Sequence, residues 1–300
     1  MERRSGFESG ERARVDGCVA DSHPFIEPVR TLRPPIILVG MHRSGTSLLT
    51  AVLREFGLIT GFSLNNEESA FFHRLNLYIE RATGGRWDDP EPIARASADP
   101  RSLRRIVDHL KKEVMGPKII LYLGLRLFWR YRSLERVDHP WGWKDPRNTF
   151  TFDFWQRVFP QARVIHIYRH GVDVAASLRA REVNSRVQAL SQYASTRCRT
   201  LAGAFGLWRA YVEKAFSLHP DGGERAIRHV RYEDFLASPE QTVRALLDFC
   251  ELPLRPDAWR RVTARLKPRR AFAFRHDPEL RAFYEEVKDD PWMIRLGYSN

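Results

Sequence analysis

A short apolar run that leads into a glycine-rich turn and then a helical pattern most limits how this chain can fold. Residues 36–57 read IILVGMHRSGTSLLTAVLREFG. The first four residues are continuously apolar, as in a strand buried on both faces of a parallel sheet. Apolar residues after Ser47 recur at helical spacing as far as Gly57, a residue type that commonly ends helices. The segment therefore predicts a strand–loop–helix unit of an α/β domain.

The same order of elements recurs further along the chain. WGWKDPRN, residues 141–148, reads as a short strand that ends in charge. ARVIHIYRHGVDVAASL, residues 162–178, reads as a strand, a glycine turn and a helix that begins near Asp173. AIRHVRYEDF, residues 226–235, predicts a further strand. Strands that alternate with helices need crossover connections, so we predict a mostly parallel central sheet flanked by helices.

The pattern around the sheet indicates one domain. Residues 1–33 are polar, charged and aperiodic, and we expect a flexible arm there. Residues 34–300 are long enough for a single α/β domain with a large core. Within them, residues 60–140 are predicted to form a largely helical insertion, and a helical tail ends the chain. In the helix predicted after the last strand, Ser238 has the position of an N-cap in a capping box with Gln241.

Charge and cysteine content narrow the environment. The net charge of +12 comes mostly from arginine, which suits polyanions such as acidic glycans, nucleic acids or phosphorylated nucleotides. Cys18, Cys198 and Cys250 are far apart and have no metal-site or disulfide spacing, so we interpret them as free thiols. The apolar runs are too short for a transmembrane segment, and no signal-peptide pattern is present. We therefore expect a cytoplasmic protein.

The glycine turn has the spacing of a phosphate-binding loop. Gly40 is followed after four residues by Gly45, and Thr46 stands where a nucleoside triphosphatase has its lysine. The amides of residues 44–47 and the positive end of the helix favour an anion. The missing lysine, and the lack of a convincing acidic metal ligand of the Walker B kind at the end of an apolar strand, argue against magnesium-dependent triphosphate hydrolysis.

A second anion site is indicated by Arg169 and Ser177. Arg169 ends a predicted strand, and Ser177 follows about two turns into the next helix. In an open parallel sheet, ligands bind at the carboxyl ends of the strands. Each residue alone would suit an ordinary surface or helix cap. Together with the glycine loop, they predict two separate phosphate sites for one nucleotide.

Taken in order, these motifs resemble those of the sulfotransferases that use 3′-phosphoadenosine 5′-phosphosulfate (PAPS). RSGTS (43–47) resembles the 5′-phosphosulfate loop, YRHGVDVAAS (168–177) the 3′-phosphate motif, and VRYEDFLASPEQTVRALLDF (230–249) the segment that follows in many members. RSGTS and WKDPRNT are closer to the Golgi and bacterial branches, including tyrosylprotein sulfotransferases, than to the cytosolic aryl branch, which carries a lysine before Ser-Gly. An RKG segment of that branch is not evident, and KPRR (267–270) is left open as a substitute.

The resemblance implies a P-loop fold and sulfuryl transfer from PAPS to a hydroxyl of a carbohydrate, glycolipid, small molecule or peptide. Adenosine 3′,5′-bisphosphate would be the product, and no metal would be required. It further implies that Arg43 stabilises the sulfuryl group and that Lys144 projects toward it, although Lys144 could instead pair with Asp145. The nucleotide contacts it implies are Arg43, Ser44, Gly45, Thr46 and Ser47 for the 5′-phosphate, Arg169 and Ser177 for the 3′-phosphate, and Tyr232 near the adenine or in the core.

The general base is less sharply indicated. Glu68 and, second to it, Glu67 follow the loop at roughly the distance at which tyrosylprotein sulfotransferases carry a catalytic glutamate. Acidic residues at the start of a helix also occur simply because they suit its dipole. His42 in the loop and Asp145 after the second strand stay open as alternatives.

Two other functions fit parts of the pattern. One is a P-loop kinase with a degenerate motif, which the missing lysine disfavours. The other is a non-catalytic basic protein that binds nucleotides or nucleic acid. Because aromatic and basic residues do not alternate as in single-strand platforms, we expect no nucleic-acid partner.

Overall fold

The computed structural model describes residues 27–63, 65–184 and 194–299. Its centre is a four-stranded sheet in the order β2-β1-β3-β4, in which every neighbouring pair is parallel. The strands are β1 (Ile36–Val39), β2 (Gly142–Lys144), β3 (Arg163–Tyr168) and β4 (Ile227–Arg231). This confirms the predicted α/β fold with a parallel sheet. The parallel pairing of β1 and β3 also brings the glycine loop after β1 and Arg169 after β3 to the same end of the sheet.

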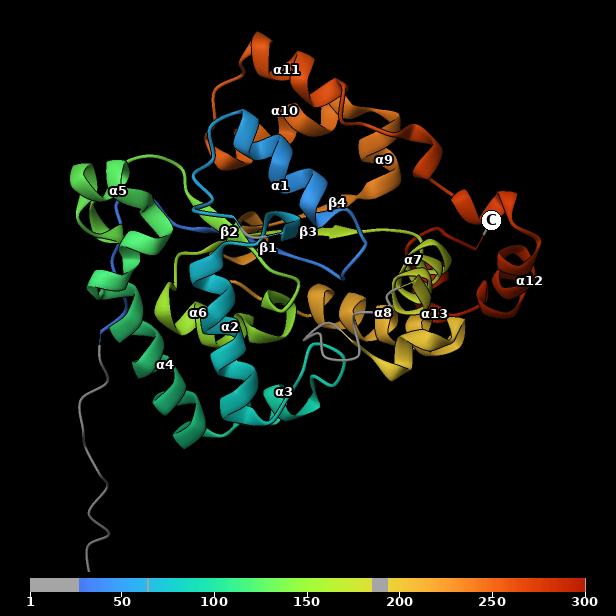
Figure 1. Cartoon of the computed structure of the whole chain (residues 1–300), viewed down its shortest axis with the longest axis horizontal. Helices are drawn as coiled ribbons and strands as arrows, with labels where there is room; N and C mark the ends of the chain where they lie inside the picture. The colour runs from blue at the N-terminus through green and yellow to red at the C-terminus, as the bar shows by residue number, and fades with distance from the viewer. Residues whose placement is uncertain (1–26, 64, 185–193, 300) are drawn as a thin grey trace, which may run out of the picture.

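One face of the sheet is covered by four helices, which lie above it in Figure 1. They are α1 (Thr46–Glu55), α9 (Tyr232–Ala237), α10 (Pro239–Cys250) and α11 (Pro256–Thr263). Leu38 of β1 and Leu53 of α1 belong to the apolar core on this side, and neither is exposed. The apolar side chains of the predicted strand and of the helix after it therefore pack between the sheet and this helical layer.

The other face carries a larger helical layer, most of which lies below the sheet in Figure 1, while the helix Ile120–Tyr131 lies at the upper left of that view. Its helices, with the C-terminal pair at the right of the view, are α2 (Ala70–Thr83), α3 (Glu91–Ala98), α4 (Pro100–Met115), α5 (Ile120–Tyr131), α6 (Asn148–Val158), α7 (Gly171–Asn184), α8 (Leu201–Phe216), α12 (Pro278–Val287) and α13 (Pro291–Arg295). Short 3-10 turns link them at η1 (Asn65–Glu67), η2 (Pro117–Ile119), η3 (Leu134–Arg136), η5 (Thr196–Arg199), η6 (Gly223–Ala226), η7 (Pro268–Arg270) and η8 (Ala273–His276).

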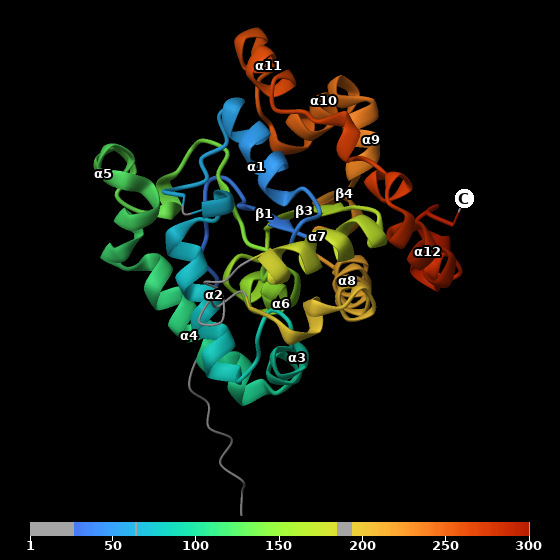
Figure 2. The same cartoon turned by 45° about the vertical axis from the view of Figure 1, so that its right-hand side comes forward.

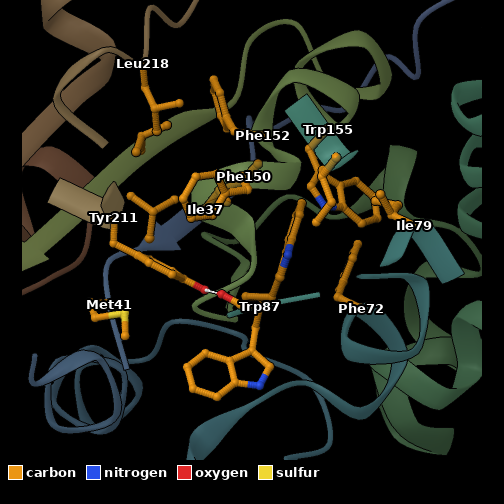
Figure 3. Packing of buried hydrophobic residues seen from close by; sticks show 14 of the residues in the cluster. Ile37, Met41, Phe72, Ile79, Trp87, Phe150, Phe152, Trp155, Tyr211 and Leu218 are labelled. Carbon is orange, nitrogen blue, oxygen red and sulfur yellow. Dashed lines mark hydrogen bonds between the residues drawn. The ribbon is translucent and has the colours of Figure 1, made fainter. Parts of the chain in front are cut away.

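The core of this second layer is rich in aromatic rings. Phe72 of α2 stacks on Trp143 of β2 with ring centroids 3.8 Å apart. Tyr211 of α8 donates a hydrogen bond of 2.8 Å to the carbonyl oxygen of Trp87, drawn as a dashed line in Figure 3. Such large buried rings contribute much of the apolar burial that stabilises a domain. They fix α2 and β2, which carry side chains of the candidate site.

Two local predictions differ from the structure. The strand predicted over residues 226–235 ends at Arg231, and Tyr232 begins α9. The reason lies in Glu233 and Asp234, because acidic residues in a first turn favour a helix. Ser238 is the N-cap of α10 as predicted, but its side chain makes no capping hydrogen bond, so the capping box with Gln241 is wrong.

The described end of the N-terminal segment packs against the domain. Val29 is 6% exposed, and its amide donates a hydrogen bond to the carbonyl oxygen of Val158. The carbonyl oxygen of Arg33 accepts one from the indole of Trp141. The rest of the predicted arm, including Cys18, lies outside the described residues. Buried free thiols are present at Cys198 and Cys250, and within the described ranges no helix has the length and apolar content needed to cross a bilayer.

Candidate active site

The loop between β1 and α1 needs its two glycines. Gly40 has φ 133°, and a Cβ there would lie 2.3 Å from the carbonyl oxygen of Ile167 on β3. Gly45 has φ 100°, and a Cβ would lie 2.5 Å from the ring of Tyr232. The left-handed conformation and the close approach both favour glycine. As a result, the loop lies tightly against β3 and α9, with the start of α1 directly behind it.

The first cavity lies on one side of this loop and has a volume of about 170 Å³. It unites six sequence-predicted side chains from the loop, the start of α1, the residue after β3, α7 and α9. Arg43 Nε donates a hydrogen bond of 2.8 Å to Ser177 Oγ. The residues that line it are Arg43, Gly45, Thr46, Ser47, Leu48, Arg169, Ser177, Tyr232, Arg265, Lys267 and Arg270. The two predicted anion sites therefore belong to one cavity.

Arg169 is held in this cavity by several contacts. Its Nη2 donates to Asp173 Oδ2 at 3.0 Å and to the carbonyl oxygen of Arg270 at 2.6 Å. Its guanidinium carbon lies 4.9 Å from the centre of the Tyr232 ring. Among the described residues, its buried Nε has no hydrogen-bond partner. Because a buried donor without a partner is costly, this nitrogen favours an added acceptor.

Three basic residues of the first cavity lie in the segment after α11. Arg265, Lys267 and Arg270 belong to the region around KPRR, which the sequence had left open. The backbone amides of Ala273 and Phe274 donate to the carboxylate of Asp173, at 3.2 and 2.8 Å. That carboxylate also pairs with Arg169, so it ties the basic segment to the strand end.

Positive charge is concentrated where the loop meets these residues. Burial lowers the pKa of the Arg43 guanidinium, and three nearby arginines lower it further, namely Arg181, Arg270 and Arg169. Like charges held this close repel one another unless an anion lies between them. Binding of a polyanion to this cluster relieves the repulsion and is therefore favourable.

A second cavity, of about 110 Å³, borders the same loop. Its lining consists of His42, Arg43, Thr46, Ser47, Asn66, Glu68, Lys144, Pro146 and Arg181. Arg43, Thr46 and Ser47 line both cavities. A ligand that extends along the loop can therefore reach from the arginine-rich cavity to the one that holds a carboxylate.

Glu68 is the carboxylate of the second cavity, and it is 2% exposed. Lys144 Nζ donates to its Oε1 at 3.2 Å, and its Oε2 lies 3.3 Å from His73 Nδ1. The partner of Lys144 is thus Glu68 rather than Asp145, the partner weighed in the sequence. Glu67 does not line this cavity, because its carboxylate accepts a hydrogen bond of 3.1 Å from Arg54 Nη2.

Asp145 lies behind the cavity and is not exposed. Its Oδ2 lies 3.0 Å from His73 Nδ1, and its Oδ1 accepts from the amide of Arg147 at 2.9 Å. Burial raises the pKa of this carboxyl, but the charge of Arg147 and the bond to His73 lower it more, so it stays ionised. Asp145 therefore does not line the cavity and is linked to Glu68 through His73.

His42, the other open alternative, does line the second cavity. Its ring lies edge-on to Trp87, with centroids 4.8 Å apart. Burial, assisted by nearby cations, lowers its pKa well below the usual range, so the ring is neutral near pH 7. Two groups that can accept a proton, Glu68 and His42, thus face the same small space.

Comparison with known protein families identifies the family of this chain. The model of the sulfotransferase family matches residues 34–256, about three quarters of the sequence. The chain belongs to the sulfotransferase family. This sulfotransferase is 26% identical over 228 residues to an uncharacterized protein of Aquifex aeolicus (strain VF5). The match covers 73% of the chain but only 26% of that relative, so the chain spans about a quarter of its length.

Solved structures of bacterial sulfotransferases are also similar. The sulfotransferase domain of the Synechococcus PCC 7002 olefin synthase is 18% identical with a TM-score of 0.46, covering 88% of this chain and 92% of that one. Sulfotransferase STF1 of Mycobacterium tuberculosis H37Rv is 17% identical with a TM-score of 0.45, covering 78% and 72%.

The chemistry of the first cavity of this sulfotransferase suits anionic groups such as phosphate. The first cavity offers guanidinium groups, an ammonium group, hydroxyls and the amides at the start of α1, all of which bind phosphate oxygens. Glu68, His73 and Asp145 have ligand atoms within 4.8 Å of one another, as a metal site would. However, Lys144 and Arg147 already lie on these carboxylates, so the cluster forms a buried ion-pair network.

Sequence reasoning missed two residues that line the second cavity or lie next to it. Arg181 of α7 lines the second cavity four residues after Ser177, one helical turn further on. That spacing is the signal that would have found it. His73 was not singled out in the sequence, yet it lies between Glu68 and Asp145. Only the fold shows this, because β2 brings Asp145 from 72 residues away.

Proposed function

We propose that this sulfotransferase moves a sulfuryl group from PAPS to an acceptor hydroxyl by in-line displacement, as enzymes of class EC 2.8.2 do. One observation carries the proposal: a cation-lined cavity and a cavity with a buried carboxylate meet on the same loop at Arg43, Thr46 and Ser47. The acceptor would be a carbohydrate, a glycolipid, a small molecule or a peptide. The free thiols at Cys198 and Cys250 fit a reducing compartment, which supports the cytoplasm as the proposed location.

In this proposal the first cavity takes the nucleotide. The amides of residues 44–47 and the hydroxyls of Thr46 and Ser47 bind the 5′-phosphate. Arg169 and Ser177 bind the 3′-phosphate, and Lys267 and Arg270 add charge to the same cavity. The Tyr232 ring forms a wall between Gly45 and Arg169. A doubly phosphorylated adenosine matches the two groups of donors, whereas a triphosphate would leave the second group without a partner.

The second cavity is where the reaction would occur. Glu68 accepts the proton of the acceptor hydroxyl. At the same time the hydroxyl oxygen forms a bond to sulfur, and the bond from sulfur to the nucleotide oxygen breaks. Lys144 and Arg43 neutralise the charge that develops on the leaving oxygen. Once protonated, Glu68 attracts Lys144 less strongly, so the ammonium group becomes available to the leaving oxygen at the same moment. The Lys144–Glu68 distance of 3.2 Å supports this coupling.

A thermal-shift experiment tests the proposed donor. Adenosine 3′,5′-bisphosphate at 100 times its dissociation constant should stabilise the protein by about 2.7 kcal/mol, which is a readily measured rise in melting temperature. AMP should give a smaller rise, because it lacks the 3′-phosphate. ADP, or ATP with magnesium, should give little.

Other outcomes of this experiment would favour the other functions. A shift with ATP and magnesium as large as that with the bisphosphate would indicate a P-loop kinase and overturn the proposal. Tight, salt-sensitive binding to DNA without any nucleotide preference would indicate a nucleic-acid-binding protein instead. Equal shifts with AMP and the bisphosphate would contradict the assignment of Arg169 and Ser177 to the 3′-phosphate.

A further inference from the structure

Helix α5 carries an exposed apolar stripe away from the candidate site. Gly124, with φ 68°, breaks the helix, which continues from Leu125. Leu125 and Trp129 are 68% and 65% exposed and lie one turn apart on the continued part. Leu121, just before the break, is 44% exposed. Both views show α5 at the outer edge of the molecule (Figures 1 and 2).

The buried side of α5 already has its partners. Tyr122 is 1% exposed, and its hydroxyl bonds the carbonyl oxygens of Ile59 and Gly142 at 2.8 and 2.7 Å. Its ring packs edge-on against Phe72 of α2, with centroids 5.1 Å apart. Folding therefore uses one face of the helix and leaves the Leu125–Trp129 stripe to solvent.

Positive charge runs beside this stripe. Arg126 and Arg130 are exposed, also one turn apart, and each follows an apolar member of the stripe directly in sequence. The guanidinium carbon of Arg132 lies 4.0 Å from the centre of the Trp129 ring. Residues 112–132 contain five lysine or arginine residues and a single acidic residue, Glu113. The pattern is that of a basic amphipathic helix.

We propose that this face of α5 binds an anionic lipid surface. Tryptophan and leucine side chains insert at the boundary between headgroups and acyl chains, and arginines beside them reach the headgroup phosphates. Charge complementarity selects this occupant, because a second copy would bring an equally basic face against the first. The proposal is independent of the sulfuryl-transfer reaction, since α5 contributes no side chain to either cavity.

Vesicle sedimentation tests this directly. The chain should sediment with vesicles of phosphatidylcholine that contain a quarter phosphatidylglycerol, at least tenfold more tightly than with phosphatidylcholine alone. Binding should weaken as salt rises, because screening reduces the contribution of the arginines. Brominated lipids should quench tryptophan fluorescence. Equal binding to both vesicle types, or none to the anionic ones, would overturn the proposal.

Two variants and a matched control locate the contact. Leu125→Ala with Trp129→Ala should abolish both binding and quenching, and Arg126→Glu with Arg130→Glu should lower the affinity at least tenfold. Arg199→Glu with Arg260→Glu makes the same change in net charge at exposed positions off α5 and should retain most binding. Equal losses in the control would assign binding to overall charge. A dimer that dissociates in the Leu125–Trp129 variant would identify a second copy as the occupant, and either result contradicts the proposal. Melting temperatures of all variants confirm folding.

Discussion

Arg169→Met is expected to lower the affinity for adenosine 3′,5′-bisphosphate by about 10- to 100-fold, because a charge-assisted contact to a phosphate contributes roughly 1.5–3 kcal/mol. The affinity for AMP should change far less, since it lacks the phosphate that this guanidinium would bind. Calorimetric titration of both ligands measures the effect. The result to report is the ratio of the two affinities.

That ratio protects the test against partial unfolding. Arg169 is buried and bonded to Asp173 and to the backbone at Arg270, so its loss can reduce the folded fraction. Both ligands are affected equally by such a loss, and it cancels in the ratio. Arg269→Met is the matched control, because Arg269 lies next to Arg270 in the same turn but does not line the cavity. A ratio that stays constant in Arg169→Met would remove Arg169 from the 3′-phosphate site.

Glu68→Gln is the second substitution with a large expected effect. It should lower kcat by about 10²- to 10⁴-fold, because a general base commonly contributes that much and an amide cannot accept the proton. The side chain keeps its size, and the proposed bisphosphate site lies in the other cavity, so nucleotide affinity should be retained. Turnover of a labelled sulfuryl donor with an acceptor found by screening provides kcat, and calorimetry provides the nucleotide affinity.

Glu67→Gln and His42→Gln are the comparisons that decide the base. Glu67 pairs with Arg54, so its substitution should leave most of the turnover. His42 lines the same cavity as Glu68 with a neutral ring and is the alternative acceptor of the proton. If Glu68→Gln retained turnover while either of the other variants abolished it, the proposed mechanism would have the wrong base.

The fold was predictable where a local pattern determines it. The apolar run before Gly40 and the glycine turns after β1 and β3 act within a few residues, so the parallel sheet and the ends of β1 and β3 could be predicted. The end of β4 could not, because the apolar alternation continues into Tyr232, while the acids after it favour a helix. At such a boundary the preferences for strand and helix compete, and tertiary contacts decide between them. Here Glu233 accepts hydrogen bonds from the His170 amide and the Tyr298 hydroxyl.

The candidate site was predictable to the extent that its residues lie in motifs. Arg43 and Ser177 were predicted from separate segments, and they meet at 2.8 Å in the structure. Arg265 and Arg270 lie in an irregular basic segment, which resembles any solvated surface until Asp173 fixes its position. The Lys144–Glu68 pair joins residues 76 positions apart, and no spacing in the chain indicates it. The roles assigned to all these residues stay predictions.

A crystal structure of the chain with adenosine 3′,5′-bisphosphate tests the central claim most directly. We predict one nucleotide along the loop, with its 5′-phosphate on the amides of residues 44–47 and its 3′-phosphate within 3.2 Å, roughly hydrogen-bond distance, of Arg169 and Ser177. The 5′ end should face Lys144 and Glu68. A nucleotide bound elsewhere, or bound here with its 3′-phosphate in solvent, would contradict the account.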